Sequence, residues 1–569
     1  LSTAGDVNGD GIDDFVVVAN TAGSTAGAAY VVYGNTSGVL PNLSGGTINA
    51  ADGFKISGQA SSSLHYSSAA GDVNGDGYAD VIMRTTGGAY VVFGGDKTAM
   101  SSLNLASFSS SQGMKIYNSG NPDGGANNFY DQYGGHLQAT TGGDLNMDGV
   151  PDIIISGNGN TTGAIESQLV IYGQATGGTV DVYNKLANAP SAGSVLHATW
   201  NHNSLINTNL GGFDFNGDGF DDSWIGANGY ADSTNAYAPG QILLGGSSYV
   251  YNISAVVPVN SGTTPRLATA AGAGDVNGDG YDDLIYTRAT SSADSASNYS
   301  EIDVIFGRAM TATVDQGTND TTAIDAGGFR ITGLDFAAKG SDYGTGGVAE
   351  LTADVNRDGM ADILISTCGG NVGYASDGAG ATLYGNEFFV VYGKTNHTAV
   401  NVADIKTGNG QGMYIHYGTN SLLGLKADIA SAGDFNGDGY DDFLITTGDY
   451  NAAYLIYGKS GGTANGGIEL STIGTAGTSD GFKIAGTAGI LNADSIGDIN
   501  GDGFADVAYS NTTDNATYIL WGGQQVGTNT PNPFNALAGD KLGTAADDTL
   551  TGTSGNNRII GGLGDDTLI

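Results

Sequence analysis

Residues 6–14 read Asp-Val-Asn-Gly-Asp-Gly-Ile-Asp-Asp, and this nine-residue pattern returns seven more times along the 569-residue chain. The other copies begin at Asp72, Asp144, Asp214, Asp275, Asp354, Asp434 and Asp498. Every copy has Asp at positions one, five and nine, Asn at position three and Gly at position six. Successive copies start 61 to 80 residues apart. The chain is therefore a series of repeats, each about 70 residues long.

Each copy of the pattern predicts a calcium site. Oxygen-bearing side chains at alternate positions of a tight loop converge on one point, and the Gly at position six permits the sharp turn. Ca²⁺ takes six to eight oxygen ligands, and Mg²⁺ fits less well because it prefers small octahedral sites and keeps several waters. A turn that is merely rich in Asp, Asn and Gly needs only one or two such residues, rather than four in a fixed register.

The predicted ligands are five residues in each loop, at positions one, three, five, seven and nine, and position seven contributes its backbone carbonyl. We expect the ions to have a structural role, holding the hairpins together. The predicted ligands are Asp6, Asn8, Asp10, Ile12 and Asp14; Asp72, Asn74, Asp76, Tyr78 and Asp80; Asp144, Asn146, Asp148, Val150 and Asp152; Asp214, Asn216, Asp218, Phe220 and Asp222; Asp275, Asn277, Asp279, Tyr281 and Asp283; Asp354, Asn356, Asp358, Met360 and Asp362; Asp434, Asn436, Asp438, Tyr440 and Asp442; and Asp498, Asn500, Asp502, Phe504 and Asp506.

Short β-rich segments surround the loops. An apolar run follows most loops, as in residues 15–18, and a second run ends in a bulky residue and Gly, as in Tyr33-Gly34. Most repeats add a third signature that begins with Gly-Phe or Gly-Met, as in residues 53–58. No segment keeps a helical period of 3.6 residues. Four short strands per repeat predict an all-β chain built as a β-propeller, whose blades are four-stranded sheets repeated radially.

The number of blades follows from the number of loops. Eight loops and eight second-run endings favour eight four-stranded blades. Seven blades are the alternative, because the sequence offers only seven segments for the outer strand. We expect the missing strand to come from residues upstream of Leu1 or from residues 523–542, closing the ring. The predicted propeller domain spans residues 1–523.

The Gly-Phe signature, the Asp-x-Asn-Gly-Asp-Gly-x-x-Asp loop and the strand ending in Gly together resemble the FG-GAP repeat. That repeat builds the propeller of integrin α subunits and of many secreted bacterial proteins. The resemblance covers residues 1–523 and implies one Ca²⁺ in the hairpin between the first two strands of a blade. The chain departs from the family at loop position four, where Met147 and Arg357 replace Gly, and the stretches 174–213 and 246–274 lack the Gly-Phe signature.

The last residues follow a different repeat. Residues 543–569 form three nonapeptides that each begin with Gly, and the third resembles the RTX calcium-binding repeat. The resemblance implies the start of a parallel β-roll, with Asp548 and Asp566 as further calcium ligands. Three nonapeptides are too few for a stable roll, so we expect the protein to continue beyond Ile569. Residues 524–542 are predicted to be a linker.

The composition excludes several classes of partner. Asp and Glu number 58 against 18 Lys and Arg, for a formal net charge of −40. This balance excludes nucleic acid and anionic membrane surfaces, which select for Lys and Arg. The single cysteine, Cys368, cannot form an internal disulfide framework. No apolar run approaches the roughly 18 residues that a membrane span needs.

These observations predict a calcium-stabilised extracellular protein, either secreted or attached to a cell surface. We expect its propeller loops to bind a protein, a glycan or another copy of the chain, as an adhesin or a surface-layer component. The RTX resemblance implies bacterial type I secretion. The alternative is a propeller-fold polysaccharide lyase or another secreted hydrolase, for which His197 and His202 beside Trp200 form the only local His cluster. We predict no catalytic residues and no cofactor other than Ca²⁺.

Overall fold

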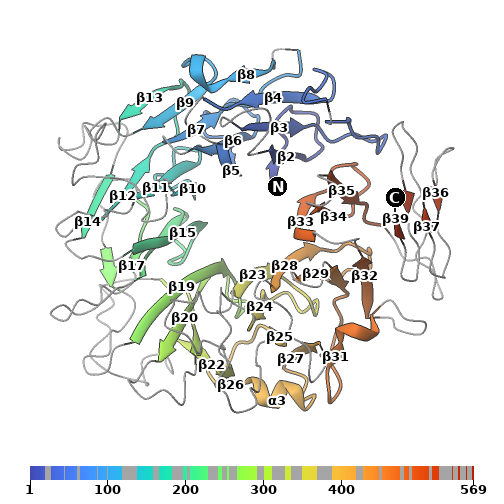
Figure 1. Cartoon of the computed structure of the whole chain (residues 1–569). Helices are drawn as coiled ribbons and strands as arrows, with labels where there is room; N and C mark the ends of the chain where they lie inside the picture. Colours follow the sequence, from blue (N-terminus) through green and yellow to red (C-terminus); the bar gives the residue numbers. More distant parts are fainter. Residues whose placement is uncertain are drawn as a thin grey trace, which may run out of the picture. The chain divides into compact units, whose positions relative to one another are not determined.

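The computed structural model of the chain is all-β, with strands gathered into several sheets (Figure 1). It divides into two compact units, one formed by Leu1–Ala270 and Gly307–Asp320 and the other by Ala271–Phe306 and Thr321–Ile569. The structure describes residues 1–19, 27–43, 45–59, 64–85, 88–98, 100–117, 138–157, 166–181, 196–200, 205–228, 241–246, 253–255, 265–290, 300–309, 327–334, 349–367, 387–417, 427–447, 452–473, 480–485, 490–511, 516–523, 541–542, 549–550, 559–560 and 567–568.

Four sheets belong to the first unit, and each contains one of the first four nonapeptide loops. The first runs in the order β1 (Ser2–Gly5), β2 (Asp14–Ala19), β3 (Ala28–Val32), β4 (Gly53–Ser57) and β8 (Leu103–Asn104). The second runs β5 (Leu64–Gly71), β6 (Asp80–Thr85), β7 (Gly88–Val92), β9 (Gly113–Tyr117) and β13 (Gly178–Asp181). The third runs β10 (Gln138–Gly143), β11 (Asp152–Gly157), β12 (Glu166–Ile171) and β14 (Leu196–Trp200). The fourth runs β15 (Leu205–Phe213), β16 (Asp222–Asn228), β17 (Gln241–Leu243) and β18 (Ile253–Ala255).

The remaining four loops lie in sheets of the second unit, although β19 starts at the end of the first unit. One sheet runs β19 (Pro265–Gly274), β20 (Asp283–Thr290), β21 (Ser300–Ile305), β22 (Gly328–Leu334) and β26 (Val400–Asn401). The next runs β23 (Ala349–Ala353), β24 (Asp362–Ser366), β25 (Glu387–Val391), β27 (Gly412–His416) and β31 (Ile468–Glu469). The next runs β28 (Ala427–Gly433), β29 (Asp442–Thr447), β30 (Ala452–Ile456) and β32 (Gly481–Ala485). The last has three described strands, β33 (Ile490–Gly497), β34 (Asp506–Asn511) and β35 (Ala516–Leu520).

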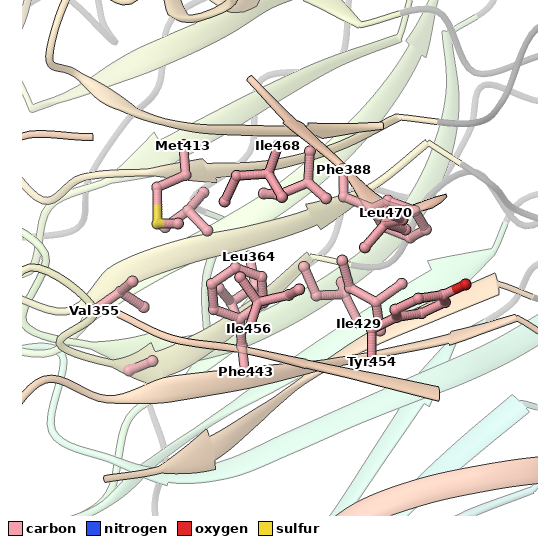
Figure 2. Close-up of a cluster of buried hydrophobic side chains, with 14 of the residues drawn as sticks. Val355, Leu364, Phe388, Met413, Ile429, Phe443, Tyr454, Ile456, Ile468 and Leu470 are labelled. Atoms are coloured by element: carbon pink, nitrogen blue, oxygen red, sulfur yellow. The ribbon is translucent and has the colours of Figure 1, made fainter. Parts of the chain in front are cut away.

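Neighbouring sheets pack face to face, and strand β24 shows why the apolar runs are continuous. Its residues Ile363 and Ile365 pack with residues of the β20–β22 sheet, whereas Leu364 between them packs with Phe443 and Tyr454 of the next sheet (Figure 2). Successive side chains of a strand point to opposite faces, so a strand buried on both sides needs apolar residues at every position. The sheet is therefore a layer between two others, as a propeller blade is.

The first strands of successive sheets lie side by side within each unit. In the first unit β1 lies beside β5, β5 beside β10, and β10 beside β15. In the second unit β23 lies beside β28, and β28 beside β33. Each of these sheets continues from its first strand through antiparallel neighbours. This arrangement confirms the predicted β-propeller-like fold.

Four sheets carry a fifth strand that the sequence analysis did not predict. Strands β8, β13, β26 and β31 each come from the connection within a later sheet and pair in parallel with the fourth strand of an earlier sheet. Three of them run directly into a single helical turn, namely η1 (Leu105–Ser107), α3 (Val402–Lys406) and η2 (Leu470–Thr472). Side-chain oxygens of Asn104, Asn401 and Glu469 cap these turns by accepting backbone N–H groups. The fifth strand therefore ties consecutive sheets together.

The expected outer strands of two sheets form without their signature. Within 174–213 and 246–274, which lack Gly-Phe, β14 and β18 occupy the fourth position. The predicted closing segment 523–542 falls almost wholly outside the described residues, as does most of the predicted linker 524–542. No helix in the described ranges combines the length and the apolarity that a bilayer crossing requires.

The C-terminal nonapeptides form two short parallel sheets. Strand β36 (Lys541–Leu542) pairs with β38 (Ile559–Ile560), and β37 (Thr549–Leu550) pairs with β39 (Thr567–Leu568). In both pairs the partners lie 18 residues apart, because Lys541 faces Ile559 and Thr549 faces Thr567. A spacing of two nonapeptides places alternate strands in alternate sheets. This pairing is what the predicted β-roll requires.

Candidate metal centres

Each nonapeptide loop joins the first strand of a sheet to the second. The first strand ends in a break of register, as between Thr3 and Gly5, and the loop follows at once. Gly11 at position six has a φ of +83°, in the left-handed region that favours Gly. Met147 and Arg357 at position four keep the same conformation, with φ values of +57° and +58°. All eight loops thus share one backbone course, and at these two positions a non-Gly residue adopts it at some conformational cost.

The carboxylate at position one organises the loop. In the first loop, Asp6 Oδ1 accepts the N–H groups of Gly9 at 2.6 Å and Asp10 at 3.0 Å, and Asp6 Oδ2 accepts that of Gly11 at 2.7 Å. The same bonds from positions four, five and six recur on Asp214, Asp275 and Asp498. In the other four loops the bonds from positions five and six are present. The loop backbone therefore wraps around its first carboxylate.

The amide at position three presents a buried oxygen. In four loops, Oδ1 of this Asn is buried and has no hydrogen-bond partner among the described residues: Asn8, Asn277, Asn356 and Asn500. In the other four, the same atom accepts the N–H of position five, as Asn74 does from Asp76 at 2.9 Å. A buried acceptor without a partner carries the full cost of its desolvation. A bound cation would satisfy all four orphaned oxygens.

The carboxylate at position five orders the next turn of the loop. Asp10 Oδ1 accepts the N–H of Ile12 at 3.1 Å, and the equivalent bond from position seven to position five recurs in the other loops. In the first loop, Asp10 Oδ2 also lies 2.6 Å from Nζ of Lys97, whose ammonium group stands over the ring of Tyr33. Asp10 therefore combines a bond within its own loop with an ion pair to the next sheet.

The carboxylate at position nine is fully buried. Asp14 has no exposed surface, and its two oxygens accept the N–H groups of Val7 at 2.9 Å and Gly34 at 2.8 Å. Burial raises the pKa of Asp14 from 3.8 to about 7, although both backbone bonds act in the opposite direction. Burial likewise raises the pKa of Asp80 to about 7, and raises to about 8 the pKa values of Asp152, Asp222, Asp362, Asp442 and Asp506. The raised pKa values mean that the ionised form of the position-nine carboxylate is disfavoured by burial, and a bound cation would stabilise it.

Backbone bonds join six of the eight loops to the segment that follows the third strand of the next sheet. The carbonyl of Val7, at position two of the first loop, accepts the N–H of Gly95, which follows the third strand of the next sheet. Equivalent bonds of 2.8 to 2.9 Å join Val73 to Gln174, Leu145 to Gly246, Phe215 to Arg308, Val276 to Lys394, and Phe435 to Gly523. Any event that orders a loop is therefore transmitted to the adjacent blade.

The loop residues fit Ca²⁺ by their chemistry and burial. Each loop gathers three carboxylates, one amide oxygen and one backbone carbonyl, all of them the hard oxygen ligands that Ca²⁺ prefers. In the described part of the chain, no group of three or more His, Cys, Asp or Glu side chains by itself forms a metal site. The structure thus does not bring the three carboxylates of any described loop to one point, and the ligand sets stay a prediction from the sequence pattern. Asp548 and Asp566, the ligands expected in the RTX segment, lie outside the described residues.

Of the two candidate catalytic histidines, the structure describes only the backbone of His197. His197 belongs to β14, where its backbone pairs with Leu169, and His202 lies outside the described residues. A different polar cluster lies on the β25–β27–β31 sheet. Glu387 accepts bonds from Lys406 Nζ at 2.6 Å and Tyr414 Oη at 2.8 Å, while the His416 ring lies 3.1 Å from Glu469 and stacks on Tyr414. The hydrogen bonds and ion pairs of this cluster are therefore made among its own side chains.

Comparison with known protein families agrees with the two kinds of repeat. The FG-GAP repeat matches residues 66–97, which contain most of strand β5, the second loop, and strands β6 and β7. The RTX calcium-binding nonapeptide repeat, in its four-copy form, matches residues 542–569. RTX repeats bind calcium, which supports Ca²⁺ as a cofactor of this protein. The chain thus carries an FG-GAP repeat within its β-sheet region and RTX calcium-binding repeats at its C-terminal end.

Proposed function

We propose that the chain is a calcium-stabilised extracellular binding protein in which each of the eight loops holds one Ca²⁺. The observation that carries this proposal is the pairing, within one loop, of a buried Asn oxygen that lacks a partner and a fully buried carboxylate. The first, fifth, sixth and eighth loops each contain both features, at Asn8 and Asp14 in the first loop for example. A cation is the simplest group that satisfies both, since both oxygens can be its ligands and its positive charge neutralises the carboxylate.

The proposed ligands are the residues at positions one, three, five and nine and the carbonyl of position seven. The ion supplies positive charge at the point where three carboxylates of a loop approach one another. Eight loops contain 24 Asp at these positions, out of 58 acidic residues in the chain. Eight divalent ions would reduce the formal charge from −40 to −24. The ions therefore act on stability by removing repulsion among fixed carboxylates.

The extracellular assignment rests on calcium supply and on the RTX repeats. Extracellular calcium modules have dissociation constants of about 10⁻⁴–10⁻³ M. Sites this weak remain empty at the low free Ca²⁺ concentration of the cytosol. Proteins with RTX repeats are typically exported by type I secretion, and residues 542–569 match that repeat. A chain whose loops fill only after export would fold outside the cell. This order of events suits a sequence whose 569 residues contain one cysteine and therefore no disulfide framework of their own.

The proposed partner is a protein, a glycan or a second copy of the chain, bound by the loops of the calcium-loaded sheets. Binding to cells or to a glycan array, measured with Ca²⁺ and with excess chelator, tests the adhesive role. Light scattering and electron microscopy on addition of Ca²⁺ test self-assembly into sheets or fibres. The proposal predicts calcium-dependent binding in one of these two assays, and binding in neither would contradict it. Uronate polymers belong in the same screen, because unsaturated products would instead identify a lyase.

A further inference from the structure

Neighbouring calcium loops are linked by the residue at position eight of the later loop. Asp441 is position eight of the seventh loop, and Asp354 is position one of the sixth. The N–H of Asp354 donates to Asp441 Oδ2 at 2.8 Å, and the N–H of Asp441 donates to the Asp354 carbonyl at 3.2 Å. One residue of the later loop thus holds both backbone groups of the first ligand in the earlier loop.

The same double link joins the third and fourth loops in the first unit. The N–H of Asp144 donates to Asp221 Oδ2 at 2.6 Å, and the N–H of Asp221 donates to the Asp144 carbonyl at 3.2 Å. Gly143 precedes Asp144 and has a φ of +71°. A Cβ at Gly143 would lie 2.2 Å from Asp221 Oδ2, so in this pair the carboxylate packs directly against the Gly. The link has therefore been built into two separate places in the chain.

Other loop pairs within a unit have a weaker link or none. Position eight is Ala79 in the second loop and Ala361 in the sixth, and each keeps only the backbone bond to the preceding loop, at 3.0 Å and 2.8 Å. Position eight of the third loop is Pro151, which has neither an N–H group nor a carboxylate. Some loop pairs are thus joined by two hydrogen bonds through position eight, some by one, and one by none. Pairs with one bond or none serve as internal controls for pairs with two.

We propose that Asp221 and Asp441 are positioning residues that couple calcium binding between neighbouring loops, the third with the fourth and the sixth with the seventh. The inference rests on the proposed calcium sites. An ion in the seventh loop fixes Asp442 at position nine, and Asp441 is the adjacent residue. Fixing Asp441 fixes the backbone of Asp354, which is the first ligand of the sixth loop. Less conformational freedom then remains to be lost when the sixth loop binds its own ion, which is positive cooperativity.

A second contact reinforces the pair formed by the sixth and seventh loops. Arg357, at position four of the sixth loop, donates from Nη1 to the carbonyl of Asp438 at 3.3 Å. Asp438 is position five of the seventh loop, so the contact runs in the direction opposite to that of Asp441. These two loops therefore hold each other through three hydrogen bonds, and each bond involves the backbone of a ligand or of the residue beside one.

The experiment is a double-mutant cycle on the full chain, read by hydrogen–deuterium exchange. The readout is the Ca²⁺ concentration at which the amides of residues 358–360 become protected, since these report on the sixth loop. Asp438→Ala removes a ligand of the seventh loop. With Asp441 present, we expect this change to raise the midpoint of the sixth loop about fivefold or more. In an Asp441→Ala background, it should raise the midpoint less than twofold.

Two controls separate coupling from general damage. Asp441→Asn keeps an oxygen that can accept the Asp354 N–H, so the coupling should be retained. Asp358→Ala removes a ligand of the sixth loop, which is joined to the fifth loop only by the backbone bond of Ala361. The Ca²⁺ midpoint of the fifth loop should therefore rise less in this variant than the midpoint of the sixth loop rises in Asp438→Ala. Equal shifts with and without Asp441, or no shift in either background, would overturn the proposal.

A gain-of-function variant covers the case in which Asp438→Ala fails to fold. Ala79→Asp places a carboxylate beside Gly5, which precedes the first loop as Gly143 precedes the third. We expect a variant that keeps the native fold to show coupling between the first and second loops, and its absence would contradict the proposal. Failure of the calcium sites themselves is distinguishable, because no loop of the unaltered chain would then show calcium-dependent protection.

Discussion

The carboxylate of Asp14 accepts the backbone N–H of Gly34 at 2.8 Å, across 20 residues of chain. Asp14 begins the second strand of the first sheet, and Gly34 follows the third. The same bond recurs from Gly94, Gly173, Gly245, Gly393, Gly458 and Gly522 to the position-nine Asp of their own sheets. Gly is required here because a Cβ at Gly94 would lie 2.4 Å from the Ala79 carbonyl oxygen. In these seven loops the last predicted ligand therefore also anchors the segment after the third strand to the start of the second strand.

Replacing Asp442 with Asn tests this double role. The side chain keeps its shape but loses its charge, and its NH₂ group would oppose a backbone donor, either Gly458 or Asn436. We expect the free energy of unfolding in Ca²⁺ to fall by about 2–5 kcal/mol, as measured by urea denaturation. Asp404→Asn, at an exposed position of α3, is the matched control and should change stability by less than about 0.5 kcal/mol. Equal effects of the two substitutions would contradict the role of Asp442.

The pKa values at position nine predict an unusual pH dependence for the calcium-free chain. Burial raises the pKa of Asp14 to about 7 and that of Asp152 to about 8, from 3.8. A raised native pKa contributes stability that is complete below the unfolded value and is lost as the pH rises through the native value. The melting temperature in chelator should therefore fall between pH 5 and pH 8.5. A melting temperature that rises over this interval would contradict the burial of these carboxylates.

Saturating Ca²⁺ should remove this trend, because the ion binds the ionised carboxylates. Binding at pH 7 should also release protons, since some position-nine groups must lose theirs first. Titration calorimetry in two buffers with different ionisation enthalpies measures the number of protons released. A binding enthalpy that is the same in both buffers would show that the carboxylates were already ionised.

Removal of calcium should destabilise the whole protein. At ten times Kd, each site stabilises the fold by about 1.4 kcal/mol, so eight sites contribute about 11 kcal/mol. This amount is comparable with the entire stability of a typical domain. We expect a chelator to lower the melting temperature by well over a few degrees, and Mg²⁺ to restore less of the loss than Ca²⁺ does. A chelator effect of only a few degrees would mean that the loops are held by their hydrogen bonds alone.

Met147 offers a test of the loop backbone itself. It has a φ of +57° where other loops have Gly, and its side chain is 60 % exposed, so packing does not compensate for the conformation. Met147→Gly should stabilise the calcium-loaded chain by about 0.5–1 kcal/mol. The reverse change, Gly217→Ala at position four of the fourth loop, should destabilise it by a similar amount, because Gly217 has a φ of +68°. Effects of the same sign from both variants would contradict a shared loop conformation.

The sequence was sufficient to predict the strands and loops, because both depend on local patterns. Residues 15–18 form part of β2, and the Gly-Phe signature at Gly53 starts β4. The loops lie between the first two strands of each sheet because Asp and Gly at fixed spacing favour only one turn conformation. The all-β, propeller-like fold follows from these local units, since a four-stranded sheet buried on both faces must pack between two others.

The fifth strands were missed because they depend on contacts between repeats. Strand β8 has two residues and no alternation of its own, and it exists because Leu103 pairs with Ile56 of the previous sheet. A usable signal was nevertheless present, since residues 103–106, 400–403 and 468–471 all read apolar, Asn or Glu, apolar, small. The second residue of this motif caps the following turn, and the first and third are buried. The links through Asp221 and Asp441 were missed for the same reason.

The most direct test is a crystal structure of the calcium-loaded chain, with anomalous difference density measured for the bound ions. The account predicts one calcium peak in each of the eight loops, surrounded by the oxygens of positions one, three, five and nine and the carbonyl of position seven. Loops that are well ordered in saturating Ca²⁺ but contain no peak would contradict it.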